Sequence, residues 1–526
     1  MNIAICIGGT GVRCFESFLY SVFAGQITDE NFRKLRVLVI DKDKNSGALR
    51  RCHEAIGEYQ SMCKVLDSKG KILILPEIQL VEDWDIQGNL PPEMSLRQIF
   101  GGSSDTLLNA MYSVEEQNVS LDKGFYGHPA IGATLFKKVM NDDKGNLMKK
   151  VTAGEHRIDD SESRVFIFGS IFGGTGAAIL PNIAKEFKID SNGESRKNVT
   201  VSGVLMLPYF DIPGKDQSAK TLLNDIVSRD FIPKTVTALK YYQHAKVVKM
   251  GESKGSGFDS LYLIGGSPLA KTPKTYSIGG DSQENRKHFV DMFAALSACD
   301  FFNGPKYLRK SIVIAKIFAS GIPGDTLTWS AFANRDNALR LLDMLRFSAI
   351  VIQYLYPPFM IYEAVSDALM KHSNVVRAMY GDGRDENGKA RITEAKIHEL
   401  NSNIRVLFAF CTRYVEYICE LCDSNYDYSR TKIEADAPGF ELFDRDSVKN
   451  LRDFARKFLT YKGDESYIPP VPDIGKLSVE KSKKTVSTIN QVNAALGKRT
   501  KYKDCFEGDF SKFIDGIYEL CKFTDK

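Results

Sequence analysis

Long hydrophobic runs are missing from this sequence. The most apolar long stretch begins at Ser348 and is broken by Gln353 and by the pair Pro357-Pro358. It falls short of the roughly 20 apolar residues of a membrane helix, and it predicts a buried helix that the prolines kink or end. The first residues run straight into a strand-like segment, without the basic and apolar regions of a secretory leader. We therefore expect a cytoplasmic protein with no membrane span.

An excess of one charge is missing too, as are clusters of catalytic or metal-binding side chains. The net charge is +4 over 526 residues, which indicates no electropositive surface for nucleic acid, so we expect no such partner. The seven histidines have no partner at catalytic or metal-ligand spacing. Among the ten cysteines, Cys419 and Cys422 form a lone CxxC pair in a helical pattern. That pattern indicates core packing rather than zinc, and we expect no site built from protein metal ligands.

Glycine, in contrast, is concentrated at two similar turns. Residues 164–187 read RVFIFGSIFGGTGAAILPNIAKEF, which predicts a buried strand, the turn Gly173-Gly174-Thr175-Gly176 and a helix. Residues 2–20 read NIAICIGGTGVRCFESFLY and repeat this order around Gly8-Gly9-Thr10-Gly11. Glycine has no Cβ to hold a ligand away, and the first turn of a helix presents unpaired N–H groups. Each turn therefore predicts a phosphate cradle, and the alternative is a tight turn without a ligand.

The common nucleotide motifs do not fit these turns. A dinucleotide-binding GxGxxG would need glycine at the positions of Cys14 and Ile179, and no Gly-Lys pair is followed by Ser or Thr as in a P-loop. Asp41 ends the strand-like segment RVLVID, where an NAD enzyme holds the ribose. A Rossmann-type oxidoreductase with a nicotinamide or flavin cofactor therefore stays open as an alternative. So does a structural scaffold that keeps the fold without a nucleotide.

Strand-like and helical segments alternate through the first half of the chain. This alternation predicts a doubly wound parallel sheet, whose carboxyl edge can bring both glycine turns together. From residue 334 onward, apolar residues at helical spacing predict a mainly helical region. We expect an α/β domain over 1–283, a core connecting helix over 284–303, and a mixed then mainly helical domain over 304–526. The strand-like segments are 3–7, 37–40, 72–75, 165–168, 201–206 and 261–264.

The two turns resemble those of the tubulin/FtsZ superfamily of GTPases, and the likeness is closer to divergent bacterial tubulin-like proteins than to eukaryotic tubulin. Gly173 to Gly176 match the GGGTG[ST]G loop that wraps the phosphates in that family. Segment 124–136 around Gly132 resembles the loop over the γ-phosphate. Segment 201–214 resembles the strand and loop whose acid, here Asp211, meets the ribose. Segment 285–302 resembles the long core helix, where Asn285 would read guanine.

The resemblance spans roughly residues 1–305 and implies a site for GTP or GDP with Mg²⁺. Asp41 follows the second strand, where the family places a residue near phosphate or Mg²⁺. The residues that would bind the nucleotide are Gly8, Gly9, Thr10, Gly11, Asp41, Gly132, Gly173, Gly174, Thr175, Gly176, Asp211 and Asn285.

The resemblance also implies self-association and slow turnover. In filaments of this family, an acidic loop of the neighbouring subunit polarises the attacking water. Here residues 303–310 read NGPKYLRK without an acid, and Asp300 and Asp325 are the nearest candidates for a catalytic carboxylate. The implied function is a nucleotide-dependent switch or filament-forming protein with slow or assembly-dependent GTP hydrolysis. The helical region would contact adjacent subunits or other proteins.

Overall fold

The structure is a computed structural model of the chain. It describes residues 1–41, 43, 45–66, 75–81, 94–101, 105–121, 125, 128–142, 147, 151–152, 158, 162–190, 192–211, 230–245, 247, 257–267, 270–271, 285–304, 312–319, 335–361, 374, 394–424, 426–427, 432–433, 440, 442–459, 477 and 510–522.

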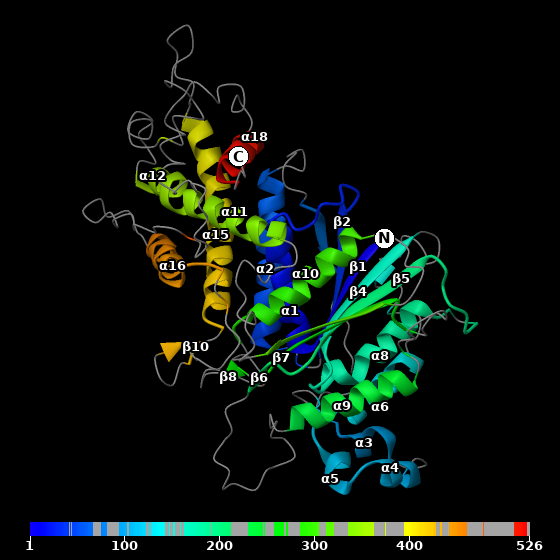
Figure 1. Ribbon diagram of the computed structural model, residues 1–526. Helices are drawn as coiled ribbons and strands as arrows, with labels where there is room; N and C mark the ends of the chain where they lie inside the picture. The colour runs from blue at the N-terminus through cyan, green and yellow to red at the C-terminus, as the bar shows by residue number, and fades with distance from the viewer. Residues whose placement is uncertain are drawn as a thin grey trace, which may run out of the picture.

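A parallel sheet forms the centre of the described structure (Figure 1). Its seven strands lie in the order β3-β2-β1-β4-β5-β7-β9, and every neighbouring pair is parallel. The chain builds outward from β1 in one direction and then from β4 in the other, so the strand order reverses between these two strands. The strands are β1 (Asn2–Ile7), β2 (Lys34–Ile40), β3 (Glu77–Leu80), β4 (Ser163–Ser170), β5 (Val199–Met206), β7 (Ser260–Ser267) and β9 (Ile312–Ala319).

Helices cover both faces of this sheet because alternate strand residues point to opposite sides. Ala4 and Cys6 of β1 face a core shared with α1 (Gly8–Phe23), α2 (Gly47–Leu66) and α10 (Phe289–Asn303). Ile3 and Ile5 face a second core shared with α6 (Pro129–Asp142) and α8 (Thr175–Lys188). Figure 1 shows α1, α2 and α10 on one side of the sheet and α6, α8 and α9 (Phe231–His244) on the other. This α/β arrangement is consistent with a Rossmann-like fold.

Most of the expected strands are confirmed, and the described strand that pairs with β2 is one that the sequence did not predict. The runs at 3–7, 37–40, 165–168, 201–206 and 261–264 all fall inside strands of the sheet. Residues 72–74 of the predicted run 72–75 lie outside the described residues, and Leu75 is not in a strand. The strand that pairs with β2 is β3, in the register Lys34↔Glu77. β3 is a short strand at the edge of the sheet, and backbone pairing with β2 holds it there. Such a strand does not need a run of apolar residues, and its sequence EIQL has none.

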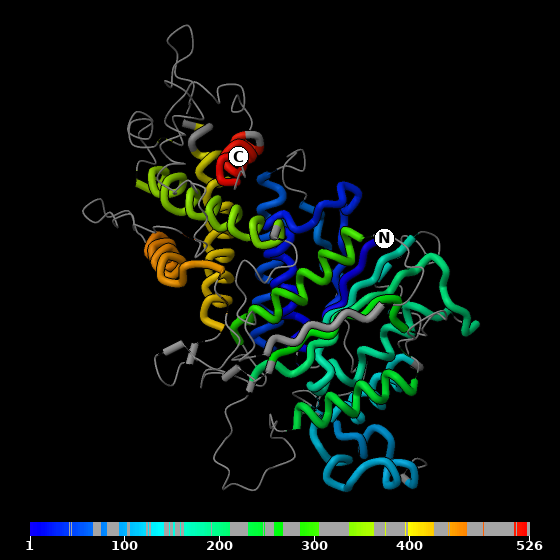
Figure 2. Tube along the Cα trace, viewed as in Figure 1, coloured from blue at the N-terminus to red at the C-terminus, as the bar shows by residue number. Residues whose placement is uncertain are grey.

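The described residues after 334 are mainly helical, as expected, and they pack on the first half without a break in the core. Its longer helices are α11 (Arg335–Ile350), α15 (Glu394–Cys422), α16 (Arg445–Leu459) and α18 (Phe510–Cys521). Figure 2 shows α15 running beside α1 and α2. The rings of Phe23 and Phe410 lie 4.6 Å apart, and those of Tyr20 and Tyr417 lie 4.8 Å apart. One hydrophobic core therefore extends from the sheet to the C-terminal helices.

The proline-containing apolar stretch adopts an interrupted helix. α11 continues into a π-helical turn (Val351–Leu355), and α12 (Tyr356–Ile361) begins just before the two prolines. The π-helical turn interrupts the regular hydrogen-bond pattern just before the prolines, whose rings would clash with that pattern in an unbroken α-helix. Cys419 and Cys422 are both buried in the core. In the part of the chain that the structure describes, no helix has the length and apolarity needed to cross a bilayer.

Two small strands and three short helices complete the described fold near the sheet. β6 (Phe210–Asp211) pairs with β8 (Ala270–Lys271) beyond the carboxyl ends of β5 and β7. The short helices α3 (Leu96–Phe100), α4 (Asp105–Met111) and α5 (Val114–Asn118) form a group below α6 and α9 in Figure 1. A second strand pair, β10 (Tyr426–Asp427) with β11 (Lys432–Ile433), follows α15.

Candidate functional site

The two glycine turns meet at the point where the strand order reverses. β1 and β4 are neighbours in the register Cys6↔Phe168, and each leads directly into its turn. A Cβ on Gly8 would lie 3.5 Å from the Cβ of Thr175 and 3.8 Å from the backbone nitrogen of Gly176. Gly8 also has a φ of 68°, a left-handed conformation that favours glycine. The sequence predicted that both turns reach one sheet edge, and the structure places them in contact.

The helices that follow these turns begin without side-chain caps. Within the described residues, no side chain bonds the first-turn N–H groups of α1 or α8, and neither first turn contains an acidic residue. By contrast, α3, α5 and α10 all begin with complete capping boxes. Uncapped N-termini leave backbone donors and the positive end of the helix dipole for another partner. Two such ends lie side by side here, and the shared site favours an anion.

The glycines of the turns have different structural reasons. A Cβ on Gly11 would lie 2.5 Å from the carbonyl oxygen of Phe168, and one on Gly176 would lie 2.3 Å from the carbonyl oxygen of Ser170. These two glycines are required because the helices pack directly against the backbone of β4. The tips of the turns are different, since they are partly exposed and lie next to each other. The tip residues are Gly9, Thr10, Gly173, Gly174 and Thr175.

Asp41 lies beside the first turn. β2 pairs with β1 in the register Ile7↔Ile40, so Asp41 follows its strand at the same level as Gly8. Its Oδ1 accepts a hydrogen bond of 3.3 Å from the backbone N–H of Asp43, and its side chain is partly exposed. This position puts a carboxylate beside the turn at which α1 begins.

Gly132 and Asp211 are connected to the second glycine turn only through neighbouring residues. Gly132 lies inside α6, not in a loop, and a Cβ there would lie 2.7 Å from the Cβ of Ala178 in α8. It therefore allows α6 to pack closely against the helix that starts at the second turn. Asp211 ends β6, and its side chain lies outside the described residues. Its neighbour Phe210 contacts Phe172 of the second turn, with 5.7 Å between ring centroids.

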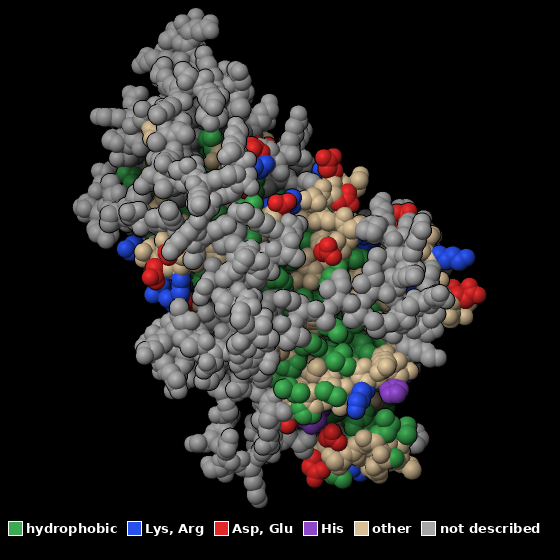
Figure 3. All heavy atoms as spheres, in the orientation of Figure 1, with side chains coloured by type: hydrophobic (Ala, Val, Ile, Leu, Met, Phe, Trp, Pro, Cys, Tyr) green, Lys and Arg blue, Asp and Glu red, His purple; other side chains and the backbone are tan. Residues whose placement is uncertain are grey.

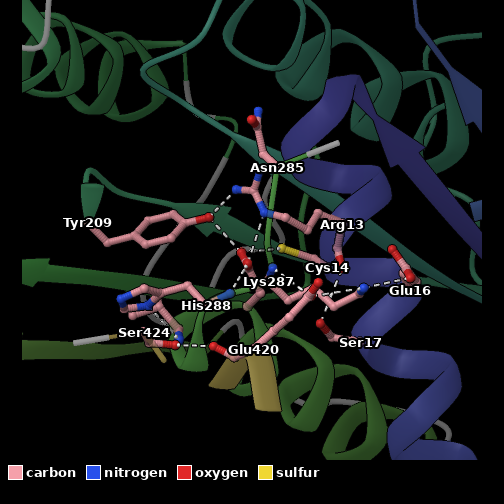
Figure 4. A network of polar contacts seen from close by, with 12 residues as sticks. Arg13, Cys14, Glu16, Ser17, Tyr209, Asn285, Lys287, His288, Glu420 and Ser424 are labelled. Atoms are coloured by element: carbon pink, nitrogen blue, oxygen red, sulfur yellow. Dashed lines mark hydrogen bonds and ion pairs between the residues drawn. The ribbon is translucent and has the colours of Figure 1, made fainter. Parts of the chain in front are cut away.

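Asn285 is buried and is linked to α1 through Arg51. It is 7% exposed, and its backbone carbonyl accepts a hydrogen bond of 2.8 Å from Nη2 of Arg51. Nε of Arg51 in turn lies 3.0 Å from Oε2 of Glu16, on α1. In Figure 4 the amide of Asn285 points to the side away from Glu420. The residue expected to read the base is therefore anchored to the helix that begins at Gly8.

A second group of polar side chains connects α1 to the start of α10. Nε of Arg13 lies 2.9 Å from Oδ2 of Asp291, and the two side chains are 5% and 0% exposed. The hydroxyl of Tyr209 donates a hydrogen bond of 2.6 Å to Oδ1 of Asp291 and also contacts Arg13. Because Arg13 is five residues beyond Gly8, this network fixes the first turns of α1 against α10.

Burial changes the protonation of several groups in this network. Burial lowers the pKa of His288 to about 4, so this imidazole is neutral near pH 7. Burial and the nearby Asp291 carboxylate raise the pKa of the Cys14 thiol well above its ordinary value. Burial alone would raise the pKa of Glu420, but Lys287 and Arg51 hold it below its ordinary value. Glu420 is therefore ionised, and Cys14 is a protonated thiol rather than a nucleophile.

Of the two carboxylates considered for catalysis, Asp300 is described by the structure, and it is not part of this site. α10 begins beside Tyr209 and ends where Arg164, at the start of β4, donates a hydrogen bond of 2.8 Å to the carbonyl of Phe302. Asp300 therefore lies toward the amino edge of the sheet, opposite the glycine turns, and it accepts a hydrogen bond of 2.7 Å from Tyr262. Asp325 and residues 305–310 of the basic loop lie outside the described residues.

Sequence reasoning missed the buried ionic network. Its signal was present in GVRCFES, where Arg13 and Glu16 stand among residues of a helix that is buried all round. Charged residues are rarely buried unless they are paired, so their presence indicates partners elsewhere in the fold. The partners come from distant parts of the chain: Asp291 is on α10, Lys287 lies in the irregular segment just before it, and Glu420 is on α15. No local sequence pattern identifies them.

Comparisons with known proteins add little to this geometry. No protein-family model matches the sequence, and no curated protein matches it. One solved structure, CetZ from Methanosaeta thermophila strain DSM 6194, aligns with 50% of this chain at 10% sequence identity and a TM-score of 0.25. The chain spans 45% of the length of that structure. Such a low TM-score does not define a shared fold, so function is inferred below from the residues themselves.

Proposed function

We propose that this chain binds a guanine nucleotide, GTP or GDP, at the two glycine turns and acts as a tubulin/FtsZ-like nucleotide-dependent switch or filament-forming protein. The observation that carries the proposal is the contact between two uncapped helix N-termini at Gly8 and Thr175. One such end binds a single phosphate group, and two adjacent ends suit a chain of phosphates. The likeness of both turns to the family's phosphate loops supports the same ligand.

The residues at the turns suit an anionic ligand with a magnesium ion. Backbone N–H groups at Gly9, Thr10, Gly174 and Thr175 would bind phosphate oxygens, and the missing Cβ atoms let those oxygens approach. Asp41 would hold Mg²⁺, directly or through water, because carboxylate oxygen is a ligand that this ion prefers. When bound, a magnesium ion would neutralise part of the charge of the phosphates. Within the described ranges no cluster of three or more His, Cys, Asp or Glu forms a separate metal site.

Hydrolysis by this site alone would be slow. Attack on a γ-phosphate needs a positioned and polarised water. The described carboxylates nearest the turns are Asp41, which would hold Mg²⁺, and Asp43, which is buried and accepts a hydrogen bond of 3.2 Å from the backbone N–H of Asn45. The other described groups at the turns are backbone N–H groups and threonine hydroxyls, which bind charge but do not accept a proton from water. Asp300 lies at the other edge of the sheet of the same molecule. A carboxylate from another copy would have to complete the site, and such turnover would follow assembly.

Exposed apolar side chains support the assembly part of this proposal. Ile232, Val236 and Tyr241 of α9 are 61%, 46% and 49% exposed. Figure 3 shows hydrophobic side chains over this helix and over the short helices next to it. Apolar groups gathered on a surface mark contacts with other molecules. We propose that further subunits or partner proteins bind the molecule through such surfaces and through its helical region.

The decisive experiment is analysis of the nucleotide that purifies with the protein. The folded protein is desalted, heated to release bound ligand, and the supernatant is separated by ion exchange beside GTP, GDP, ATP and NAD standards. We expect guanine nucleotide in an amount approaching one per chain. Recovery of NAD or a flavin would favour the Rossmann-type oxidoreductase. A protein that carries nothing and binds none of these ligands when they are added would be a scaffold without a nucleotide.

A further inference from the structure

Residues 285–288, which begin with Asn285, have no regular structure, and side chains from other elements hold the backbone here. The carbonyl of Asn285 accepts from Arg51 of α2 at 2.8 Å. The N–H of Lys287 donates to Oε2 of Glu420 at 3.1 Å, and the N–H of Phe289 donates to Oγ of Ser424 at 3.1 Å. The path of residues 285–288 and their entry into α10 are therefore set from outside the segment, because residues 285–288 lack the hydrogen-bond ladder of a helix or strand.

Two of these partners belong to one face of the C-terminal helical region. Glu420 is on α15, and Ser424 follows four residues later, just after that helix ends, so both side chains lie on the same side of it. Ser424 is itself anchored, since its Oγ donates a hydrogen bond of 3.3 Å to the carbonyl of Glu420. Figure 4 shows both side chains directed at the segment that contains Lys287 and His288. The end of α15 therefore fixes the backbone of the segment that follows Asn285.

The contact between α15 and this segment contains ion pairs as well as hydrogen bonds. Nζ of Lys287 lies 3.2 Å from Oε2 of Glu420 and 2.7 Å from Oε1 of Glu16 on α1. The Lys287 and Glu16 side chains are 5% and 2% exposed, and that of Glu420 is 23% exposed. Lys287 therefore joins α15 to the helix that begins at the first glycine turn. Because the pairs are largely shielded from water, they are directional and costly to separate.

We infer that Glu420 and Ser424 are positioning residues for base recognition, so that the docking of α15 controls how tightly the site holds the base of its nucleotide. This inference rests on the proposed function, because it assigns a regulator to the same site. Base binding at Asn285 and docking of α15 stabilise one conformation of the segment, and each therefore strengthens the other. A partner that displaces α15 would weaken binding of the base while leaving the phosphate cradle at Gly8 and Thr175 intact.

The test separates base binding from phosphate binding. Affinities for GTP and for inorganic triphosphate are measured by calorimetry on the full chain and on Glu420→Gln and Ser424→Ala. We expect Glu420→Gln to weaken GTP binding about 10-fold, while its affinity for triphosphate stays within about twofold of the wild type. Ser424→Ala should change both affinities in the same pattern but less, since it removes one neutral hydrogen bond.

Hydrogen exchange provides a readout that does not depend on a ligand. In nucleotide-free protein, Glu420→Gln should speed exchange of the amides of Lys287 and Phe289. Glu416→Gln is the matched control, because it removes the same charge one turn earlier on α15, where the partner is Arg456 of α16 at 3.0 Å. That variant should leave GTP affinity and these amides unchanged.

The possible failures are distinguishable. If the wild type binds neither GTP nor triphosphate, the proposed function is wrong and this inference falls with it. If the wild type binds GTP and folded Glu420→Gln and Ser424→Ala bind it equally well, only the inference is overturned. Equal losses for GTP and triphosphate would also overturn it, because they would show a general structural effect. An equal effect of Glu416→Gln would do the same.

Discussion

The guanidinium of Arg13 lies 2.9 Å from the carboxylate of Asp291, and the two side chains are almost wholly removed from water. This pair joins the second helical turn of α1, just after the first glycine turn, to the first helical turn of α10. Removing one partner leaves a buried charge without compensation, so Asp291→Asn should lower the free energy of unfolding by about 3–5 kcal/mol. Urea denaturation measures this loss. The double variant Arg13→Met/Asp291→Asn should recover part of it, and additive losses would show that the pair is not coupled.

Substitutions at the glycines should separate ligand binding from folding. Gly174 has φ −75°, which valine tolerates, so folded Gly174→Val should lose nucleotide affinity because its side chain blocks approach to the backbone. Gly176→Ala should lower stability by about 2–3 kcal/mol, since its Cβ would lie 2.3 Å from the Ser170 oxygen. Gly57→Ala, with nothing within 4 Å, is the control and should be neutral or slightly stabilising. Wild-type nucleotide affinity in Gly174→Val would show that the second turn is not a phosphate site.

Selectivity for guanine should depend on Asn285. An amide that is paired with the base edge discriminates because the wrong base leaves polar groups unpaired, at a cost of about 1–3 kcal/mol per group. Competition of ATP against labelled GTP should show a preference for GTP in the wild type and a smaller preference in Asn285→Ala. Equal affinity for the two nucleotides in the wild type would take Asn285 out of this role.

Stability should fall on mild acidification because of His288. Its pKa is about 4 in the folded protein against an ordinary 6.5, so below pH 6.5 the unfolded chain takes up a proton that the folded chain does not. The free energy of unfolding should therefore decrease as the pH falls from 6.5 toward 4. His288→Asn keeps a side chain that can cap α10 but removes the titration. Urea midpoints between pH 7 and 5 should show a shallower decline for this variant, and identical slopes would contradict the assignment.

Nucleotide turnover should be slow at every protein concentration. Phosphate release is followed over a wide range of protein concentration in the wild type, Asp300→Ala and Asp325→Ala. Tyr262→Phe is the control for Asp300, because it removes the hydrogen bond of 2.7 Å but keeps the carboxylate. We expect slow release throughout and intact GTP recovered from the protein. Fast release that rises steeply with concentration and disappears in an Asp→Ala variant would reveal a carboxylate that acts on a neighbouring copy.

The features that sequence reasoning found are those that neighbouring residues determine. Both strand–glycine–helix units were predictable, because buried strand runs, helical spacing and glycine requirements are local patterns. The parallel sheet followed by a helical region came from the same patterns. The glycine requirement had two physical causes that the sequence could not separate. Gly11 and Gly176 allow helix–strand packing, whereas the tips at Gly9 and Gly174 are partly exposed.

By itself, then, the sequence determined the two turns, their place at the ends of strands, and the helical character of the last part of the chain. The tertiary structure alone decided that Gly8 touches Thr175, that β3 pairs with β2, and that Arg13 pairs with a residue 278 positions away. The physical reason is the sequence distance over which each interaction acts. Propensity and periodicity act over a few residues, whereas a buried ion pair, an edge-strand register and a contact between two turns depend on how distant segments pack.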